Sequence, residues 1–152
     1  MNTKDNDIYF MKLALKEASL AFRECEIPIG AVLVKDDKVI AHSHNCREAS
    51  KDPTGHAEIV VLRSGTNERE SWRFTDATLY VTKEPCIMCA GAMVNARLGR
   101  LVYGCKDEKN GAVGSLYNLL SDKRLNHQVE VVSGILEEEC AEILKRFFQS
   151  RR

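Results

Sequence analysis

Extended and helical patterns alternate along the 152 residues of the chain, and this alternation limits the folds that it can adopt. The continuous apolar run at residues 29–34 is typical of a strand covered on both faces, and residues 38–42 follow a Lys-Asp-Asp turn as its hairpin partner. Three more strands are expected at residues 77–82, 100–104 and 128–134. This order predicts one domain over residues 1–152, with a mixed five-stranded sheet in a three-layer α/β/α sandwich.

Helical patterns separate and flank these strands. After residues 5–7, which offer N-cap side chains, apolar residues recur at helical spacing: Phe10, Leu13, Ala14, Ala18, Ala21 and Phe22. Further helices are expected at residues 56–64 and 85–97 and near residues 115–120, with a loop at residues 65–76. The last helix is expected to carry one apolar face, made of Cys140, Ile143, Leu144, Phe147 and Phe148.

Charge and composition exclude several classes of function. Lys plus Arg and Asp plus Glu both number 22, so the whole chain has no net attraction to nucleic acid or anionic membranes, and such binding requires a local patch. No stretch approaches the roughly 18 apolar residues of a membrane span, and the N-terminus lacks a signal-peptide pattern. We therefore expect a soluble cytoplasmic protein. Of its six cysteines, Cys86 and Cys89 are closely paired, and most of the other four are expected to be buried small apolar residues.

The cysteine pair is the first indication of chemistry. Cys86 and Cys89 directly follow a proline and lie three apart in the first turn of an expected helix, where both can face one ion. The spacing alone is compatible with a redox pair, a structural zinc site or a catalytic zinc site. A second source of ligands is needed to decide, and His56 offers one at the start of another expected helix, at the same end of the sheet.

Two thiolates and one imidazole supply three ligands, and a zinc ion with three protein ligands and one open position is the catalytic arrangement. Glu58 would then accept a proton from water at the metal. Residues i and i+2 on a regular helix point about 200° apart, so His56 must lie at or before the helix start. Residues 52–55 are loop-forming, which favours that placement. The His-x-Glu and Pro-Cys-x-x-Cys segments together match the signature of zinc deaminases.

Other residues offer alternatives to a catalytic zinc site. Cys46 is the one plausible fourth ligand, and its participation would make the site a structural zinc centre with no use for Glu58. His42, His44 and His127 have no partners at ligand spacing and are expected to be surface or hydrogen-bonded histidines. The loop around Gly111 lacks the Gly-Lys-Ser/Thr ending of a phosphate-binding loop.

The sequence resembles a known family, the bacterial tRNA-specific adenosine deaminases of the cytidine deaminase-like superfamily. The resemblance covers nearly the whole chain. It is carried by the segments IPIGAVLV, HNCRE, DPTGHAEI, TLYVTKEPCIMCAGAMVNARLGRLVYGCKDEKNGAVGSL and NHQVEVVSGILEEECAEILKRFFQSRR. It implies a homodimer, with one zinc per subunit, that converts the wobble adenosine of a tRNA anticodon loop to inosine.

The resemblance also assigns residues. His56, Cys86 and Cys89 match the zinc ligands and Glu58 the proton shuttle. Asn45 matches the residue expected to hydrogen-bond the base, although Asn45 alone would be interpreted as a turn-former. Ile27, Pro28 and Ile29 match a wall of the base pocket. Two residues depart from the family pattern, because Lys83 stands where an apolar residue is expected and Gln149 where a basic one is common.

The C-terminal segment carries four cations and no acid: Lys145, Arg146, Arg151 and Arg152. They are candidate phosphate contacts, but cations at a helix C-terminus also suit the helix dipole. Two alternative functions stay open at this stage. The first is a free-base deaminase of the same superfamily acting on guanine, which would need no phosphate contacts. The second is a zinc-stabilised RNA-binding module without activity.

Overall fold

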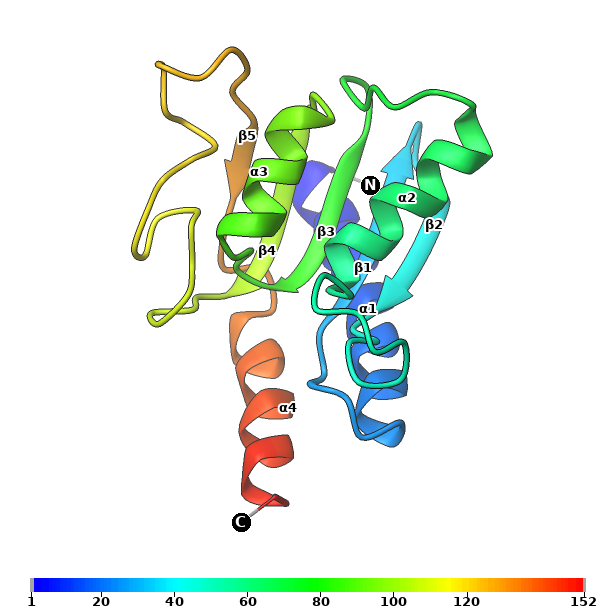
Figure 1. The fold of residues 1–152 in the computed structure, drawn as a ribbon, viewed down its shortest axis with the longest axis vertical. Helices are drawn as coiled ribbons and strands as arrows, with labels where there is room; N and C mark the ends of the chain where they lie inside the picture. The colour runs from blue at the N-terminus through cyan, green and yellow to red at the C-terminus, as the bar shows by residue number, and fades with distance from the viewer. Residues whose placement is uncertain (1, 152) are drawn as a thin grey trace.

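A computed structural model of the protein describes residues 2–151. Its five strands form one mixed sheet in the order β2-β1-β3-β4-β5 (Figure 1). The strands are β1 (Gly30–Lys35), β2 (Lys38–His44), β3 (Thr78–Lys83), β4 (Arg100–Cys105) and β5 (Glu130–Val132). Strand β1 is antiparallel to both of its neighbours, whereas β3, β4 and β5 are mutually parallel. The expected mixed five-stranded sheet is confirmed.

Among the described residues, the helices form one layer on each face of this sheet. They are α1 (Thr3–Arg23), α2 (Ala57–Arg69), α3 (Ile87–Asn95) and α4 (Glu137–Gln149). Helices α2 and α3 cover one face, while α1 and α4 lie on the other (Figure 1). The three-layer α/β/α sandwich is therefore confirmed. No helix among residues 2–151 is both long and apolar enough to cross a membrane.

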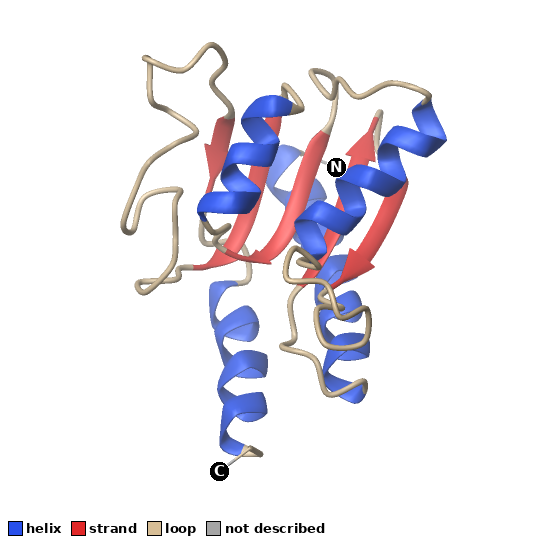
Figure 2. Cartoon of the chain, in the orientation of Figure 1, coloured by secondary structure: helices blue, strands red, loops and turns tan. Residues whose placement is uncertain are grey.

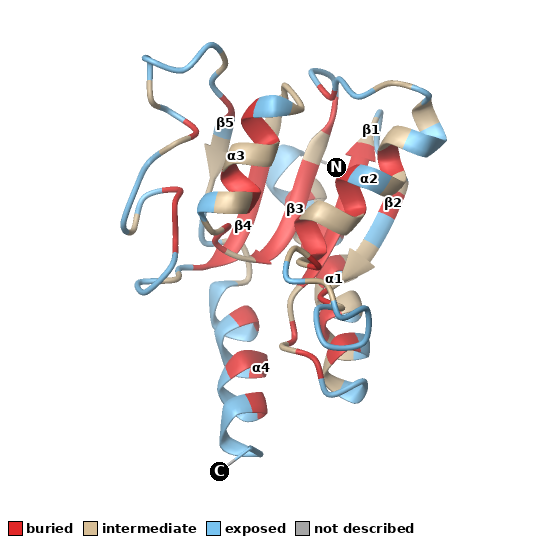
Figure 3. Ribbon diagram, in the orientation of Figure 1, coloured by how far each residue is buried: buried red, intermediate tan, exposed pale blue. Residues whose placement is uncertain are grey.

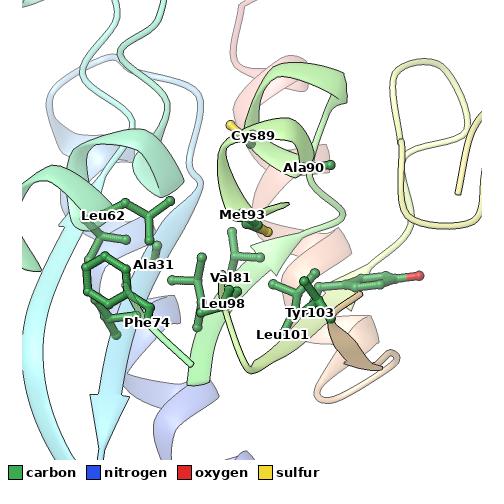
Figure 4. Packing of buried hydrophobic residues seen from close by; sticks show 14 of the residues in the cluster. Ala31, Leu62, Phe74, Val81, Cys89, Ala90, Met93, Leu98, Leu101 and Tyr103 are labelled. Carbon is green, nitrogen blue, oxygen red and sulfur yellow. The ribbon is translucent and has the colours of Figure 1, made fainter. Parts of the chain in front are cut away.

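Each face of the sheet buries its own apolar cluster, because the central strands are covered on both sides (Figure 3). Under α2 and α3, Leu62 and Phe74 pack near Ala31, and Met93 lies over Val81 (Figure 4). On the opposite face α1 approaches β1 so closely that a Cβ on Gly30 would lie 2.0 Å from the carbonyl oxygen of Ala14. Glycine is required there because no side chain fits between helix and strand.

Helix α3 is two residues shorter at each end than expected, and larger differences occur in α1 and α2. Helix α1 begins earlier than residues 5–7 suggested, because the side chain of Asn2 accepts from the N–H of Asp5 and is the N-cap. Helix α2 continues through Gly65 to Arg69, where a loop was expected. A Cβ on Gly65 would lie 2.6 Å from Leu33 Cδ2. Close packing of the helix on the core therefore outweighs the roughly 1 kcal/mol helix penalty of glycine.

Two further expectations were wrong. Residues 115–120 form no helix and lie instead in the long irregular connection between β4 and β5 (Figure 2). That segment is held by an isolated bridge between Val113 and Asn118. In α4, the side chains of Cys140, Ile143, Leu144 and Phe147 are buried as expected, but Phe148 is 45% exposed.

Candidate active site

The candidate metal ligands lie at the N-termini of two helices. His56 is the N-cap of α2 and has extended backbone angles, so it precedes the first helical turn as the sequence required. Cys86 is the N-cap of α3, and Cys89 lies on its first turn. Strand β2 runs antiparallel to β1, as does β3, so β2 and β3 end at the same edge of the sheet. The starts of α2 and α3 therefore lie side by side there (Figure 1).

Three ligand atoms converge at this edge. His56 Nδ1 lies 3.5 Å from the Sγ atoms of both Cys86 and Cys89. Bond lengths to a tetrahedral zinc predict about 3.6 Å between a nitrogen and a sulfur ligand. The donor set therefore fits zinc, and it could hold a metal ion with all three ligand atoms within 4.8 Å of one another.

Cys46 does not belong to this group within the described residues. The four cysteines outside the cluster are free thiols, and Cys105 and Cys140 are buried as expected. Cys25 is exposed and Cys46 is partly buried, so burial of most of these four was not correct. A set of three protein ligands leaves one position for water or substrate.

Electrostatics at the cluster favour a metal-binding thiolate. Hydrogen bonding with Cys89, and to a lesser degree with His56, lowers the pKa of Cys86 to about 4. Hydrogen bonding with Cys86 and burial raise the pKa of the Cys89 thiol, and hydrogen bonding with Cys86 raises the pKa of His56. Cys86 is therefore ionised at neutral pH, which is the form of cysteine that binds metals.

Glu58 lies in the first turn of α2, two residues after His56, and its side chain is 4% exposed. Burial raises its pKa to about 7, close to the value at which a carboxyl group both accepts and returns a proton at neutral pH. Glu58 and His56 line the same cavity. Two residues at i and i+2 within a helix would point in nearly opposite directions, but His56 lies before the first helical residue and is not bound by that geometry.

That cavity has a volume of about 340 Å³ and carries most of the predicted base pocket. Ile27, Ile29 and Asn45 line it, whereas Pro28 is buried but is not part of the lining. Asn45 Nδ2 donates to the carbonyl oxygen of Ile27 at 3.4 Å, and its Oδ1 accepts from the N–H of Arg47 at 3.3 Å. A carboxamide has two N–H donors, so one remains for a ligand.

The cavity also contains residues that the sequence did not single out as a site. Glu84 and Asp107 line it, together with Arg47, Ile87 and Asn110. Glu84 is buried and accepts the N–H groups of Asp107, Val113 and Ser115 and the hydroxyl of Ser115. Burial raises the pKa of Glu84, but these hydrogen bonds together outweigh burial and hold the pKa below its ordinary value. In the sequence, the position of Glu84 two residues before Cys86 was the one signal that it belongs to the site.

Among the C-terminal cations within residues 2–151, Arg151 lies next to this cavity. Arg151 and Phe148 line a second hollow, which shares Ile27, Asn45 and Arg47 with the cavity. Arg151 stacks on Phe147 at 4.7 Å and donates to the carbonyl oxygen of Cys25. Arg146 lies 5.8 Å from the ring of Phe22, Lys145 is exposed, and Arg152 lies outside the described residues.

A His, a Cys-x-x-Cys pair and a buried Glu at the helix starts of such a sandwich define a deaminase, and comparisons with known proteins agree. Residues 4–152 match the model of the MafB19-like deaminase family. A curated tRNA-specific adenosine deaminase of Bacillus subtilis is 49% identical over 146 residues, covering 96% of this chain and 91% of the relative. The chain thus belongs to the family of tRNA-specific adenosine deaminases.

Solved structures show the same fold. One, from a study of A-to-I editing by tRNA:A34 deaminases at the wobble position, superposes with a TM-score of 0.86 and 48% identity, covering 89% of this chain and 98% of that one. A guanine deaminase from Bacillus subtilis superposes with a TM-score of 0.63 and 35% identity, covering 70% of this chain and 66% of that one. The chain is therefore more similar to the adenosine deaminase than to the guanine deaminase.

Proposed function

We propose that residues 1–152 form a single zinc-dependent deaminase domain that converts the wobble adenosine of a tRNA anticodon loop to inosine. The observation that carries this proposal is the convergence of His56, Cys86 and Cys89 beside the buried Glu58 in a cavity lined by Asn45. The 49% identical relative is named a tRNA-specific adenosine deaminase, and the structure with a TM-score of 0.86 comes from a study of A-to-I editing at the wobble position. A tRNA substrate implies a cytoplasmic location.

We assign one zinc ion per chain to the three ligands. When bound, zinc supplies a Lewis acid that lowers the pKa of water to about 7. Glu58 takes a proton from the attacking water as the water oxygen bonds to C6 of adenine, and it delivers that proton to N1. Glu58 then passes the second proton of the water to the leaving amino group, so the C6–N bond breaks and ammonia departs.

The other cavity residues orient the base. Asn45 lines the cavity, and its remaining N–H is assigned to an acceptor atom of the purine. Ile27 and Ile29 offer apolar surface to the faces of the ring. An anticodon loop suits such a pocket because its unpaired bases are splayed out at lower cost than bases in a duplex.

Phosphate contacts are assigned to the cations around the entrance. Arg47 lines the cavity, Arg151 lines the adjoining hollow and Lys145 is exposed. Arg146 and Arg152 complete the set proposed for the RNA backbone. Arg151 already serves α4 by stacking on Phe147, so its loss is expected to affect packing as well as RNA binding.

We also propose a homodimer. A hollow between α2 and α3 is lined largely by apolar groups, among them Ile59, Leu62, Trp72, Phe74, Ala92 and Ala96. Trp72 is half exposed there. An exposed apolar patch of this kind is typical of a protein contact, and the resemblance names a second copy of the chain as the occupant.

The test is an incubation of zinc-loaded protein with an anticodon stem-loop carrying adenosine at the wobble position, with free guanine in a parallel tube. Inosine formed only from the stem-loop would support the proposal. Ammonia formed only from guanine would overturn the substrate and leave the roles of the metal ligands and Glu58 intact. Metal-loaded protein that is silent in both tubes would favour an RNA-binding module without activity.

A further inference from the structure

Lys83 places a cation inside the cavity wall. It is the last residue of β3, three residues before Cys86, and it lines the cavity together with Asp107. Its Nζ lies 3.1 Å from Asp107 Oδ2, and the two side chains are 21% and 11% exposed. A largely buried ion pair in a cavity wall has a desolvation cost, so its presence beside the candidate metal ligands needs an explanation.

The acid of this pair is held firmly in place. The N–H of Asp107 donates to Glu84 Oε1 at 3.0 Å. Its Oδ1 accepts the N–H groups of Lys109 and Asn110, both at 3.1 Å. The carboxylate therefore cannot turn away from the cavity without breaking the turn at residues 107–110, and its second oxygen is the one that Lys83 contacts.

Acidic groups in the cavity repel a polyanion unless cations balance them, and Arg47 and Lys83 are the Arg and Lys side chains among its lining residues. Glu58, Glu84 and Asp107 all line the cavity. The charge of Glu84 is met by four hydrogen bonds from the loop at residues 107–115. Asp107 has Lys83 as its cationic partner. A nucleotide brings one negative phosphate per residue to the entrance, and charges in a partly enclosed cavity are screened less than those at the surface.

We propose that Lys83 is a specificity-determining residue that neutralises Asp107, so that a nucleotide with its phosphodiester groups enters the cavity without repulsion. The inference rests on the proposed function and deepens it. A free base carries no phosphate, so the pair has no effect on its binding. Lys83 acts through the charge of Asp107, and the two residues form one unit.

A double-mutant cycle on the stem-loop substrate tests this unit. Lys83→Met removes the cation and leaves Asp107 unpaired, so KM is expected to rise about fivefold to tenfold, with kcat changed less than about twofold. Asp107→Asn retains an oxygen for the turn and removes the charge. The double variant is therefore expected to return KM to within about twofold of wild type. The rise in KM of Lys83→Met is expected to shrink at high salt.

The matched control is the ion pair of Lys35 and Asp76 at the opposite end of the sheet, where Lys35 Nζ lies 3.2 Å from Asp76 Oδ2. Lys35→Met and Asp76→Asn are expected to leave KM unchanged. Zinc content and melting temperature of each variant show whether folding is intact. If the KM effects of Lys83→Met and Asp107→Asn add independently, or if Lys83→Met lowers kcat alone, the inference is wrong. A wild-type protein inert on the stem-loop would instead reject the proposed function itself.

Discussion

At the scale of the residue, the proposed chemistry depends on one buried carboxyl group. Glu58 is held in the cavity by the first turn of α2, and burial raises its pKa to about 7. Glu58→Gln keeps the shape of the side chain but cannot move a proton. We expect kcat on the stem-loop to fall by about 10²–10⁴ while the zinc content stays at one ion per chain. Near wild-type turnover would show that the proton shuttle is assigned to the wrong residue.

Glu84 is a second buried carboxylate, but its role is to hold the cavity wall. It accepts three backbone N–H groups and one hydroxyl from residues 107–115. Glu84→Gln turns an amide N–H₂ toward these donors, so we expect the free energy of unfolding to fall by about 1–3 kcal/mol. Urea denaturation measures the change, with the exposed Glu108→Gln as a neutral control. Equal stabilities of wild type and Glu84→Gln would contradict this role.

At the scale of the element, a charged contact joins α1 to β2 next to the cavity. His44 Nδ1 lies 2.9 Å from Glu17 and its Nε2 lies 3.1 Å from Glu24. Burial lowers the pKa of His44, but hydrogen bonds with Glu17 and Glu24 outweigh burial and hold the pKa above its ordinary value. A raised folded pKa adds stability that is complete below the unfolded pKa of about 6.5 and is lost as pH rises through the folded value.

The corresponding prediction concerns His44→Gln. Its free energy of unfolding is expected to fall about 1–2 kcal/mol below that of wild type near pH 6, with the gap closing at more alkaline pH. Denaturation curves across this pH range measure the gap. Among residues 2–151, His42 has Glu17 as its one carboxylate partner, and its side chain is exposed. His42→Gln therefore serves as the control and is expected to show a smaller gap. A gap for His44→Gln that is constant with pH would rule out the charged contact.

The local sequence pattern predicted helices and strands correctly where tertiary packing favours the same structure as the pattern does. The apolar run of β1 and the proline and small residues of α3 indicated the observed structure. Sequence reasoning failed where distant contacts decide. Gly65 stays helical because it packs against Leu33 and Phe74. Residues 115–120 have a helical pattern, yet Glu84 binds the N–H of Ser115 and Leu119 pairs with Ala112. Neither partner is visible in the local sequence.

At the scale of the whole molecule, the convergence of His56, Cys86 and Cys89 was predictable because chain direction alone brings them together. Strands β2 and β3 run the same way, so the loops that follow them meet at one edge. The pairing of Lys83 with Asp107 was not predictable. It depends on the register of β3 with β4, which places Lys83 beside Cys105 and hence near the loop that starts at residue 106. Residue type therefore identifies ligands, while register determines the residues that surround them.

The proposed homodimer also concerns the whole molecule, and we assign its interface to the hollow between α2 and α3. Trp72 is 52% exposed at that hollow, and Tyr9 on α1 is 51% exposed on the opposite face of the sheet. Light scattering is expected to give wild type twice the 17.1 kDa mass of the chain. Trp72→Glu would bury a charge at the interface and is expected to yield a monomer, whereas Tyr9→Glu remains a dimer. A monomeric wild type would refute the dimer, and dissociation by Tyr9→Glu alone would move the interface to α1.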